Sequence, residues 1–467
     1  MFGLAIWDTE TKRLVLARDP AGIKPLYYSI YNNQLIFSSE LMPILEAGVP
    51  RILNQKAAAH YFRLLYVPKG MTMIKGVHKL LPGRMLVYEN GVTTEKQIVG
   101  EWSATAPRTY GDAVAAVRSG VEEAVTRQLV SDRPVGVYLS GGIDSSAILA
   151  AAVATHPAIN TYSVGFDLEE GEEPGKFNAD MELAARTAKH FGATHHEYRL
   201  RADEVVALMP KMVRHLHCPV ANATALAQLF LADKTKETAT VVLSGEGGDE
   251  LFGGYERYRL AHLASYLGPF AKGGVDRYAQ LMFQKDAELV LKNPQMSTTK
   301  DLFRSEFGTG NITDELMRAD EHNWLVDEAL LRADAMGMAA SIEVRVPFLD
   351  LELAALARAL PRQWKVTGRV TKRILRDAFR DVLPPEILSQ PKRGWFSPGA
   401  KWLRRPEFVQ YAEGVFVDGY TPASALLDMP AMRQLWGDHR SKRGYHYSVL
   451  WAALVFLSWA KEYRITL

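Results

Sequence analysis

The chain has 467 residues, and its 55 Lys and Arg against 53 Asp and Glu leave a formal net charge of +2. A hydrophobic content of 48% with 23% charged residues is typical of a globular protein with a large core, so general disorder is excluded, and the near-neutral charge gives no reason to expect a nucleic-acid or membrane partner. The single cysteine, Cys218, excludes an intrachain disulfide and a cysteine-based zinc cluster, and it is typical of a reducing cytoplasm.

The first hundred residues are predicted to be rich in β-strands. Short β-branched and aromatic runs alternate with turn formers, and Asn90-Gly91 is a strong hairpin signal, while residues 56–65 have helical character. Small and polar residues with a proline fill 101–108, which is typical of a linker. The predicted organisation is therefore a β-rich domain over 1–100, a linker over 101–108 and a second domain over 109–467.

The second domain alternates continuous apolar runs with helical patterns. Thr109 and Asp112 resemble a capping pair that begins a helix. Buried strands are expected at 135–139, 161–166, 196–200 and 240–244, with helices between them. This alternation predicts an α/β fold with a doubly wound parallel sheet, followed by a mostly helical part from about residue 255. The apolar run 449–457 is too short to cross a bilayer and predicts a buried helix.

Two glycine-rich turns follow two of these strands, SGGIDSS over 140–146 and SGEGGDE over 244–250. Ligands of open parallel sheets bind beyond the carboxyl ends of the strands, and glycines at such a turn let backbone amides approach an anion. Asp144 would repel a bare phosphate, so it predicts a bridging Mg²⁺, to which Asp249 would add a second carboxylate. The alternative is a structural turn with incidental serines, and neither of the common phosphate-binding loop patterns is present.

Other charged residues near these turns have two interpretations. Glu246, between two glycines, is a candidate base or proton relay, or else a solvated loop charge. The solvated interpretation fits Glu250 better than Glu246, because an apolar stretch follows Glu250. Lys392 would by default be a surface lysine.

The motifs together resemble the glutamine-hydrolysing asparagine synthetases of the ATP pyrophosphatase superfamily. The resemblance runs from end to end in the family's order. Its strings are ARDPAGIKPLYY (17–28), FSSE (37–40), KLLPG (79–83), SGGIDSS (140–146), SGEGGDELFGGY (244–255), SIEVRVPFLD (341–350), TKRILRDAF (371–379) and ILSQPKRGWFSPGAKWL (387–403). It implies an ATP pyrophosphatase domain with a helical C-terminal part, preceded by a partial amidotransferase domain of the N-terminal-nucleophile type.

The resemblance also implies a reaction and a set of site residues. ATP and Mg²⁺ would activate aspartate as β-aspartyl-AMP with release of pyrophosphate, and ammonia would then displace AMP to give asparagine. Glu246 would handle the ammonia proton, Lys392 would neutralise charge on the α-phosphate, and Arg345 is a candidate contact for the acid. Adenosine would lie against Leu139, Val164, Ser244 and Gly245, pyrophosphate against Ser140, Gly141, Gly142, Asp144 and Ser145, and magnesium on Asp144 and Asp249.

The start of the chain departs from the family pattern. Glutaminase-active members begin with a nucleophilic cysteine, whereas Met1 to Ala5 here aligns with the middle of that domain, and Cys218 lies in the synthetase half. No glutaminase nucleophile is therefore expected in this chain. Three explanations stay open: a start placed too late, a separate glutaminase partner, or a naturally ammonia-dependent enzyme. A homodimer also stays open.

Two rival functions remain beside aspartate amidation. One is a related AMP-forming ligase that amidates another carboxylate, such as a sugar acid or a peptide, and the other is a catalytically idle partner protein. The presence of Asp144, Asp249, Glu246 and Lys392 together favours an enzyme.

Overall fold

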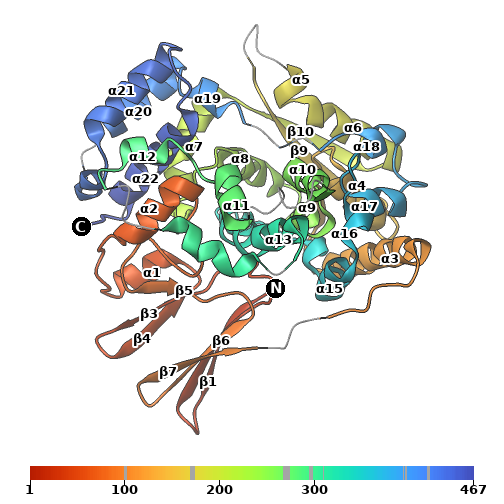
Figure 1. The fold of residues 1–467 in the computed structure, drawn as a ribbon, viewed down its shortest axis with the longest axis horizontal. Helices are drawn as coiled ribbons and strands as arrows, with labels where there is room; N and C mark the ends of the chain where they lie inside the picture. Colours follow the sequence, from red (N-terminus) through yellow and green to blue (C-terminus); the bar gives the residue numbers. More distant parts are fainter. Residues whose placement is uncertain are drawn as a thin grey trace.

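The computed structural model describes residues 1–98, 103–168, 174–266, 274–293, 298–308, 310–392, 394, 397–417 and 421–467. The beginning of the predicted linker, residues 101–102, lies outside this part of the chain, and residues 103–107 have no regular structure. Figure 1 shows the amino-terminal strands on one side of the molecule and the mixed helical and sheet region on the other.

Two small antiparallel sheets form the amino-terminal part, as the alternating runs predict. One has the order β1-β2-β6-β7 and the other β4-β3-β5. Asn90 and Gly91 both have positive φ, 51° and 79°, which is the hairpin turn that their sequence predicts. The strands are β1 (Gly3–Asp8), β2 (Arg13–Arg18), β3 (Tyr27–Tyr31), β4 (Gln34–Ser38), β5 (Val77–Lys79), β6 (Arg84–Glu89) and β7 (Val92–Gln97), with helices α1 (Leu41–Glu46) and α2 (Gln55–Leu64).

The second region is built on a five-stranded parallel sheet of order β10-β9-β8-β11-β12. The chain runs outward from β8 to β10, then returns to the other side of β8 with β11 and β12, so the doubly wound prediction is confirmed. The strands are β8 (Val135–Tyr138), β9 (Asn160–Phe166), β10 (Thr194–Leu200), β11 (Val241–Leu243) and β12 (Glu343–Arg345). Strand β12 is not predicted by the sequence pattern; it has three residues and adds to the sheet by pairing with β11.

Apolar cores cover both faces of this sheet, which explains the continuous apolar strands. Val137 and Leu243 belong to the core shared with α3, α4 and α6, whereas Val242 and Val164 belong to the core shared with α7, α8 and α14. The helices of this region are α3 (Tyr110–Leu129), α4 (Ile143–Val153), α5 (Pro174–Phe177), α6 (Ala179–Phe191), α7 (Ala202–His215), α8 (Thr224–Thr235), α9 (Gly248–Phe252) and α10 (Glu256–Ala264). Thr109 caps α3 by accepting from the amide of Asp112, as predicted.

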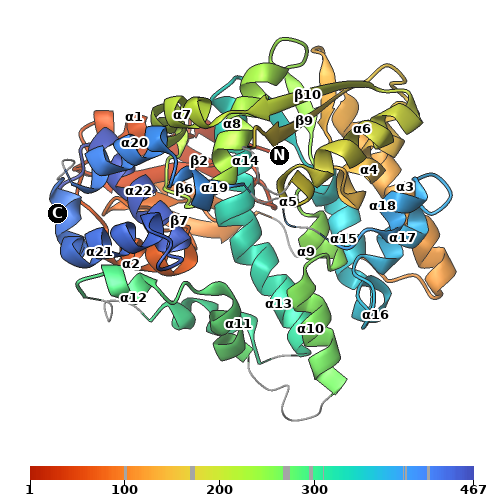
Figure 2. The same cartoon turned by 90° about the horizontal axis from the view of Figure 1, so that it is seen from above.

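The rest of the chain is largely helical. Helix α13, a π-helical segment η4 and α14 continue one another and form the long rod beside α10 in Figure 2. The elements are α11 (Gly274–Met282), α12 (Ala287–Val290), η3 (Thr299–Glu306), α13 (Ile312–Ala319), η4 (Asp320–Leu330), α14 (Leu331–Met338), η5 (Pro347–Leu349), α15 (Leu351–Ala359), α16 (Arg362–Lys365), α17 (Arg373–Ala378), α18 (Pro385–Ser389), α19 (Gly399–Trp402), α20 (Pro406–Phe416), η6 (Pro422–Leu426), α21 (Met429–Arg440) and α22 (Tyr447–Glu462).

The C-terminal helix α22 is buried and contains the apolar run predicted to form a core helix. It packs on α2, and the hydroxyl of Tyr61 donates to the carbonyl of Ala452 at 2.9 Å. Beyond α22, Thr466 forms a parallel bridge with Ile52. The end of the chain thereby closes onto the amino-terminal part. Across the described residues, every helix is too short or too polar to serve as a membrane span.

Candidate active site

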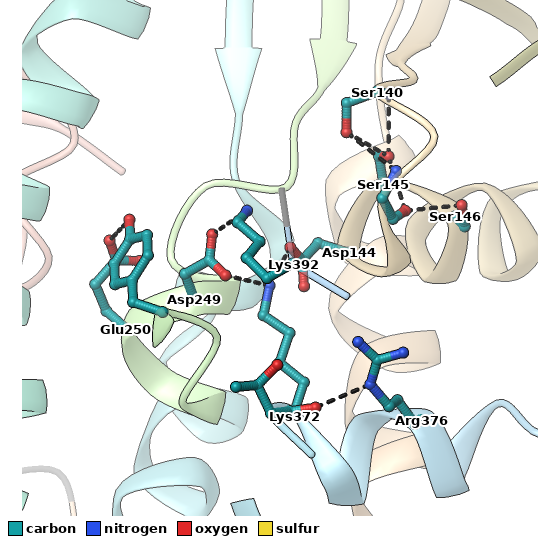
Figure 3. Close-up of polar contacts among 12 residues, drawn as sticks. Ser140, Asp144, Ser145, Ser146, Asp249, Glu250, Lys372, Arg376 and Lys392 are labelled. Carbon is teal, nitrogen blue, oxygen red and sulfur yellow. Dashed lines mark hydrogen bonds and ion pairs between the residues drawn. The ribbon is translucent and has the colours of Figure 1, made fainter. Parts of the chain in front are cut away.

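The two glycine-rich turns meet at the point where the strand order reverses. The turn after β8 leads into α4 and the turn after β11 leads into α9, and β8 and β11 are neighbours in the sheet. In a doubly wound sheet this reversal opens a ligand-binding crevice beyond the carboxyl ends of the strands. Figure 3 shows side chains from both turns directed into the same region.

The first turn is held by its own serines. The Ser145 hydroxyl accepts from the amide of Ser140 at 3.1 Å and donates to the carbonyl of Gly142 at 3.2 Å, and the Ser146 hydroxyl also donates to Gly142 at 2.8 Å. Gly141 has a φ of +69°, and a Cβ there would lie 2.5 Å from the carbonyl oxygen of Asp180. Only glycine fits this position, so the turn is a fixed loop at the amino-terminus of α4.

The centre of the region is a cluster of two carboxylates and two ammonium groups. Lys372 pairs with Asp144, and its Nζ lies 2.5 Å from Oδ1 of Asp249, while Nζ of Lys392 lies 2.5 Å from the other oxygen of Asp249 (Figure 3). The structure thus brings together three predicted site residues, Asp144, Asp249 and Lys392. It adds Lys372, which lies within the family string 371–379 and for which the sequence predicts no role.

The cluster shifts the pKa of its members. Burial alone would raise the pKa of Asp249, but Lys372 and Lys392 outweigh it and hold that pKa well below the usual range. Burial alone would lower the pKa of Lys392, but the carboxylates of Asp249 and Asp144 raise it above its ordinary value. Asp249 is therefore ionised and Lys392 is charged throughout the neutral pH range.

Two glycines leave room for the cluster. A Cβ at Gly248 would lie 2.8 Å from Oδ1 of Asp144, and a Cβ at Gly254 would lie 1.7 Å from Oδ1 of Asp249. Both contacts are shorter than real Cβ atoms accept, so a side chain at Gly248 or at Gly254, just after α9, would have to displace one of the carboxylates.

Arg376 fixes the segment that carries Lys392. It lies on α17, one turn after Lys372, and its guanidinium donates to the carbonyls of Leu388 and Gln390 at 2.6 and 2.9 Å. The two lysines of the cluster are thereby tied to one another through the backbone. Arg376 lies within the family string 371–379, but no pattern in the sequence assigns it this role.

Glu246 and Glu250 occupy different surroundings in the second turn. Burial raises the pKa of Glu246, and the nearby Arg332 opposes the rise. Glu250 is buried at 3% exposure and accepts from the hydroxyl of Tyr255 at 2.6 Å, and burial together with Asp249 raises its pKa to about 8. The interpretation of Glu250 as a solvated loop charge is therefore wrong.

Of the other predicted site residues, four lie at or beside the two central strands, and Arg345 is engaged elsewhere. Leu139 and Ser244 directly follow the two central strands, Gly245 lies against Asp144, and Val164 is on β9, the next strand outward. The guanidinium of Arg345 points elsewhere: it pairs with Glu343 at 2.6 Å and donates to two carbonyls at the end of α3, those of Gln128 and Val130. Arg345 is thus engaged away from the charged cluster.

The donor set fits a magnesium ion. Asp144 and Asp249 both reach one cationic nitrogen, so their oxygens already converge on a single centre, and Oδ1 of Asp144 is buried without a hydrogen-bond partner. In the described part of the chain, no group of three or more His, Cys, Asp or Glu side chains is placed to hold a metal. Two carboxylates suit Mg²⁺, which takes its other ligands from water and substrate phosphates.

Comparisons with known proteins agree with this architecture. The asparagine synthase family model matches residues 116–461, and a glutamine amidotransferase domain model matches residues 1–99. An asparagine synthetase [glutamine-hydrolyzing] 1 of Bacillus subtilis is 31% identical, over 98% of this chain and 77% of its own length. A putative asparagine synthetase [glutamine-hydrolyzing] of Mycobacterium bovis is also 31% identical, over 98% of this chain and 76% of its own. The amidase chry2 of Gibberella zeae is 24% identical, over 88% and 71%.

Fold and site define a doubly wound α/β enzyme whose charged cluster lies at the strand-order reversal, preceded by a small antiparallel β region. The sequence matches are more specific, because the first family model covers most of the chain and the bacterial relatives match it almost from end to end. The chain therefore belongs to the asparagine synthase family and is an enzyme of the ligase class.

Proposed function

We propose that this chain is an AMP-forming carbon–nitrogen ligase that converts aspartate to asparagine in the cytoplasm, with ATP and ammonia as co-substrates. The observation that carries the proposal is the cluster of Asp144, Asp249, Lys372 and Lys392 at the ends of the two central strands. Pre-placed cations stabilise charge best where it develops in a transition state, and adenylation of a carboxylate develops charge on the α-phosphate. The family membership supports the same reaction.

The residues divide into binding and catalytic roles. The turn from Ser140 to Ser145 binds pyrophosphate through amides and hydroxyls, and Leu139, Val164, Ser244 and Gly245 hold the adenosine. Asp144 and Asp249 hold Mg²⁺, which when bound shields the phosphate oxygens from these carboxylates. Lys392 faces the α-phosphate, and it is the more accessible lysine, with 30% of its side chain exposed against 1% for Lys372.

Glu246 serves the second half-reaction, in which ammonia attacks the activated carbonyl of β-aspartyl-AMP and AMP leaves. An attacking ammonia must lose a proton, and a carboxylate is a suitable acceptor when its pKa is raised toward neutrality. Burial raises the pKa of Glu246 in this direction. Behind it, the buried pair of Arg332 and Glu328 fixes the local charge, with Nε of Arg332 donating to Glu328 at 2.8 Å.

We assign residues 1–100 to the amidotransferase part and 109–467 to the synthetase part, joined by 101–108. An activity assay tests both the reaction and the source of ammonia. Purified chain receives ATP, Mg²⁺ and aspartate with either ammonium or glutamine, and pyrophosphate, AMP and asparagine are measured. Product with ammonium alone indicates an ammonia-dependent enzyme or one that needs a separate glutaminase partner. Absence of pyrophosphate with every acid tested, in folded protein, would contradict the ligase proposal.

A second candidate function is amidation of a different carboxylate by the same adenylation chemistry. The relatives named amidases, such as chry2 at 24% identity, favour it, and Arg345 is engaged away from the cluster, so no contact to aspartate is defined by that residue. The same assay separates the two candidates: pyrophosphate released with a sugar acid or a peptide carboxylate, and not with aspartate, would select the second.

A further inference from the structure

Lys372 occupies the position between Asp144 and Asp249 that a divalent cation would take. Its ammonium contacts an oxygen of each carboxylate, and its side chain is only 1% exposed. Lys392, by contrast, contacts only the outer oxygen of Asp249. Asp144 is nine-tenths buried, and its Oδ1 has no hydrogen-bond partner, so one acceptor in the cluster is still unused.

The backbone holds Lys372 in this position. Lys372 immediately precedes α17 and has a φ of +52°, a left-handed conformation that lysine rarely adopts. A Cβ at Gly254 would lie 2.3 Å from Cε of Lys372, so the lysine stem lies directly against that glycine. Such a conformation persists only where the surroundings fix it.

The charges of the cluster cancel as it stands, because two ammonium groups face two carboxylates. A bare divalent cation entering between the carboxylates would place its charge beside two lysines in a buried site, where such repulsion is strong. A cation that arrives with a triphosphate brings its own negative charge, and it offers Lys372 a phosphate oxygen in exchange for the carboxylates.

We propose that Lys372 is a resident counter-ion that excludes free divalent cations from Asp144 and Asp249, so that the metal enters only together with the triphosphate. This inference rests on the proposed function, since it concerns the same metal and nucleotide site. Lys372 acts here as a positioning residue: it keeps two buried carboxylates together until the metal replaces it.

The test measures metal binding without turnover. Mn²⁺ is titrated into the full chain, and free Mn²⁺ is followed by electron paramagnetic resonance, with and without a non-hydrolysable ATP analogue. We expect wild type to bind Mn²⁺ measurably only with the analogue. Lys372→Met should bind Mn²⁺ without nucleotide at least about tenfold more tightly than wild type, because a nearby like charge is removed.

Two matched variants separate position from charge. Lys392→Met also removes a positive charge from the cluster, but it leaves the bridge between the carboxylates in place, so its Mn²⁺ affinity should rise less than that of Lys372→Met. Lys365→Met removes a buried lysine elsewhere and should bind Mn²⁺ as wild type does. Equal Mn²⁺ affinity of wild type and Lys372→Met would overturn the proposal, as would nucleotide-independent binding to wild type.

Thermal melting with and without Mg²⁺ tests the proposal even if Lys372→Met is unstable. Without Lys372 the two buried carboxylates repel each other, so Lys372→Met should melt at a lower temperature, and Mg²⁺ alone should restore a larger share of that loss than it adds to wild type. Lys372→Gln, which retains a hydrogen-bond donor, provides the same comparison if Lys372→Met does not fold. No stabilisation of either variant by Mg²⁺ contradicts the proposal. If wild type binds neither Mn²⁺ nor the analogue under any condition, the proposed function itself fails.

Discussion

Asp249 is the residue on which the candidate site converges. Each of its oxygens lies 2.5 Å from a different ammonium nitrogen, and the two lysines come from different segments far along the chain. Asp144 contributes from the opposite turn and meets only one of them. The two carboxylates are therefore not equivalent: both oxygens of Asp249 contact a lysine nitrogen, whereas the contact of Asp144 with Lys372 is made through Oδ2, and its Oδ1 has no hydrogen-bond partner.

This difference makes Asp144→Asn an informative substitution. It keeps the size of the side chain but removes the charge and the metal affinity of the free oxygen. We expect the kcat/KM for pyrophosphate release to fall by about a hundredfold or more, as when one preorganised electrostatic group is lost from an active site. Asp132→Asn, at an exposed carboxylate in the loop before β8, is the matched control and should retain activity. Wild-type turnover by a folded Asp144→Asn protein would remove Asp144 from the site.

A second residue gives a pH prediction that does not involve the site. Lys365, at the end of α16, is buried, and this burial lowers its pKa to about 8 from an ordinary 10.5. Between these values the folded protein releases a proton that the unfolded chain keeps, so stability should rise with pH across this window and stay level below it. Urea unfolding should show a rise of about 1.4 kcal/mol per pH unit relative to Lys365→Met. Parallel pH profiles of the two proteins would contradict the prediction.

At the scale of elements, the site depends on how the second glycine-rich turn ends. Helix α9 spans only Gly248 to Phe252, and Gly254 follows it at a point where a Cβ would overlap Asp249 and Lys372. The short helix carries Asp249 and is followed closely by Gly254, whose missing side chain leaves room for Asp249 and Lys372. A larger residue in place of Gly254 would push Asp249 away from Lys372 and so away from Asp144.

Gly254→Ala should accordingly act as an active-site variant without changing a charged group. The added methyl must displace Asp249 or Lys372, so pyrophosphate release should fall at least about tenfold, and the free energy of unfolding should fall by about 1–3 kcal/mol from overpacking. Gly414→Ala is the control, because it lies within α20 with no atom near the added carbon, and alanine there favours the helix. Equal activity of the Gly254 and Gly414 variants would show that the cluster tolerates displacement.

Elements with a clear period or composition could be predicted from the sequence. The strands from β8 to β11 and the cap of α3 follow from continuous apolar runs and local side-chain chemistry. Strand β12 has three residues and pairs with β11, and Glu250 is buried and accepts from the hydroxyl of Tyr255. Lys372 joins the site from a helix start with left-handed backbone, which no local pattern signals. Strand β12, the burial of Glu250 and the place of Lys372 all depend on contacts between distant parts of the chain, which a local sequence pattern does not show.

At the scale of the molecule, buried ion pairs join the amino-terminal part to the rod formed by α13, η4 and α14. Lys79, at the end of β5, lies 2.5 Å from Asp327, and both side chains are nearly inaccessible. Asp327 also accepts from the amide of Lys69 at 2.7 Å, and Lys24 pairs with Asp334 at 2.6 Å one helix further on. On the same rod, Glu328 and Arg332 form a hydrogen-bonded pair whose charges act on Glu246. One rod thus touches both the β region and the candidate site.

Removal of one partner should show how strongly the two parts are coupled. Lys79→Met leaves the buried Asp327 carboxylate without its cation, which costs about 3–5 kcal/mol in such pairs. Urea denaturation should register this loss as a lower midpoint. Lys75→Met, at an exposed lysine of the same segment, should change the free energy of unfolding by less than about 0.5 kcal/mol. An unchanged midpoint in Lys79→Met would mean that the β region is not held by this pair.

The contact between the two ends of the chain has a consequence for synthesis on the ribosome. Helix α2 packs on α22, and the backbone at Arg51 and Leu53 bonds to Thr466, the penultimate residue. Domains of a nascent chain generally fold in order from the amino-terminus. Here the apolar face of α2 is made long before α22, whose Phe456 packs against Tyr61 and Phe62 of that face. A nascent chain in which α22 has not yet been made therefore exposes part of the apolar face of α2 to chaperones.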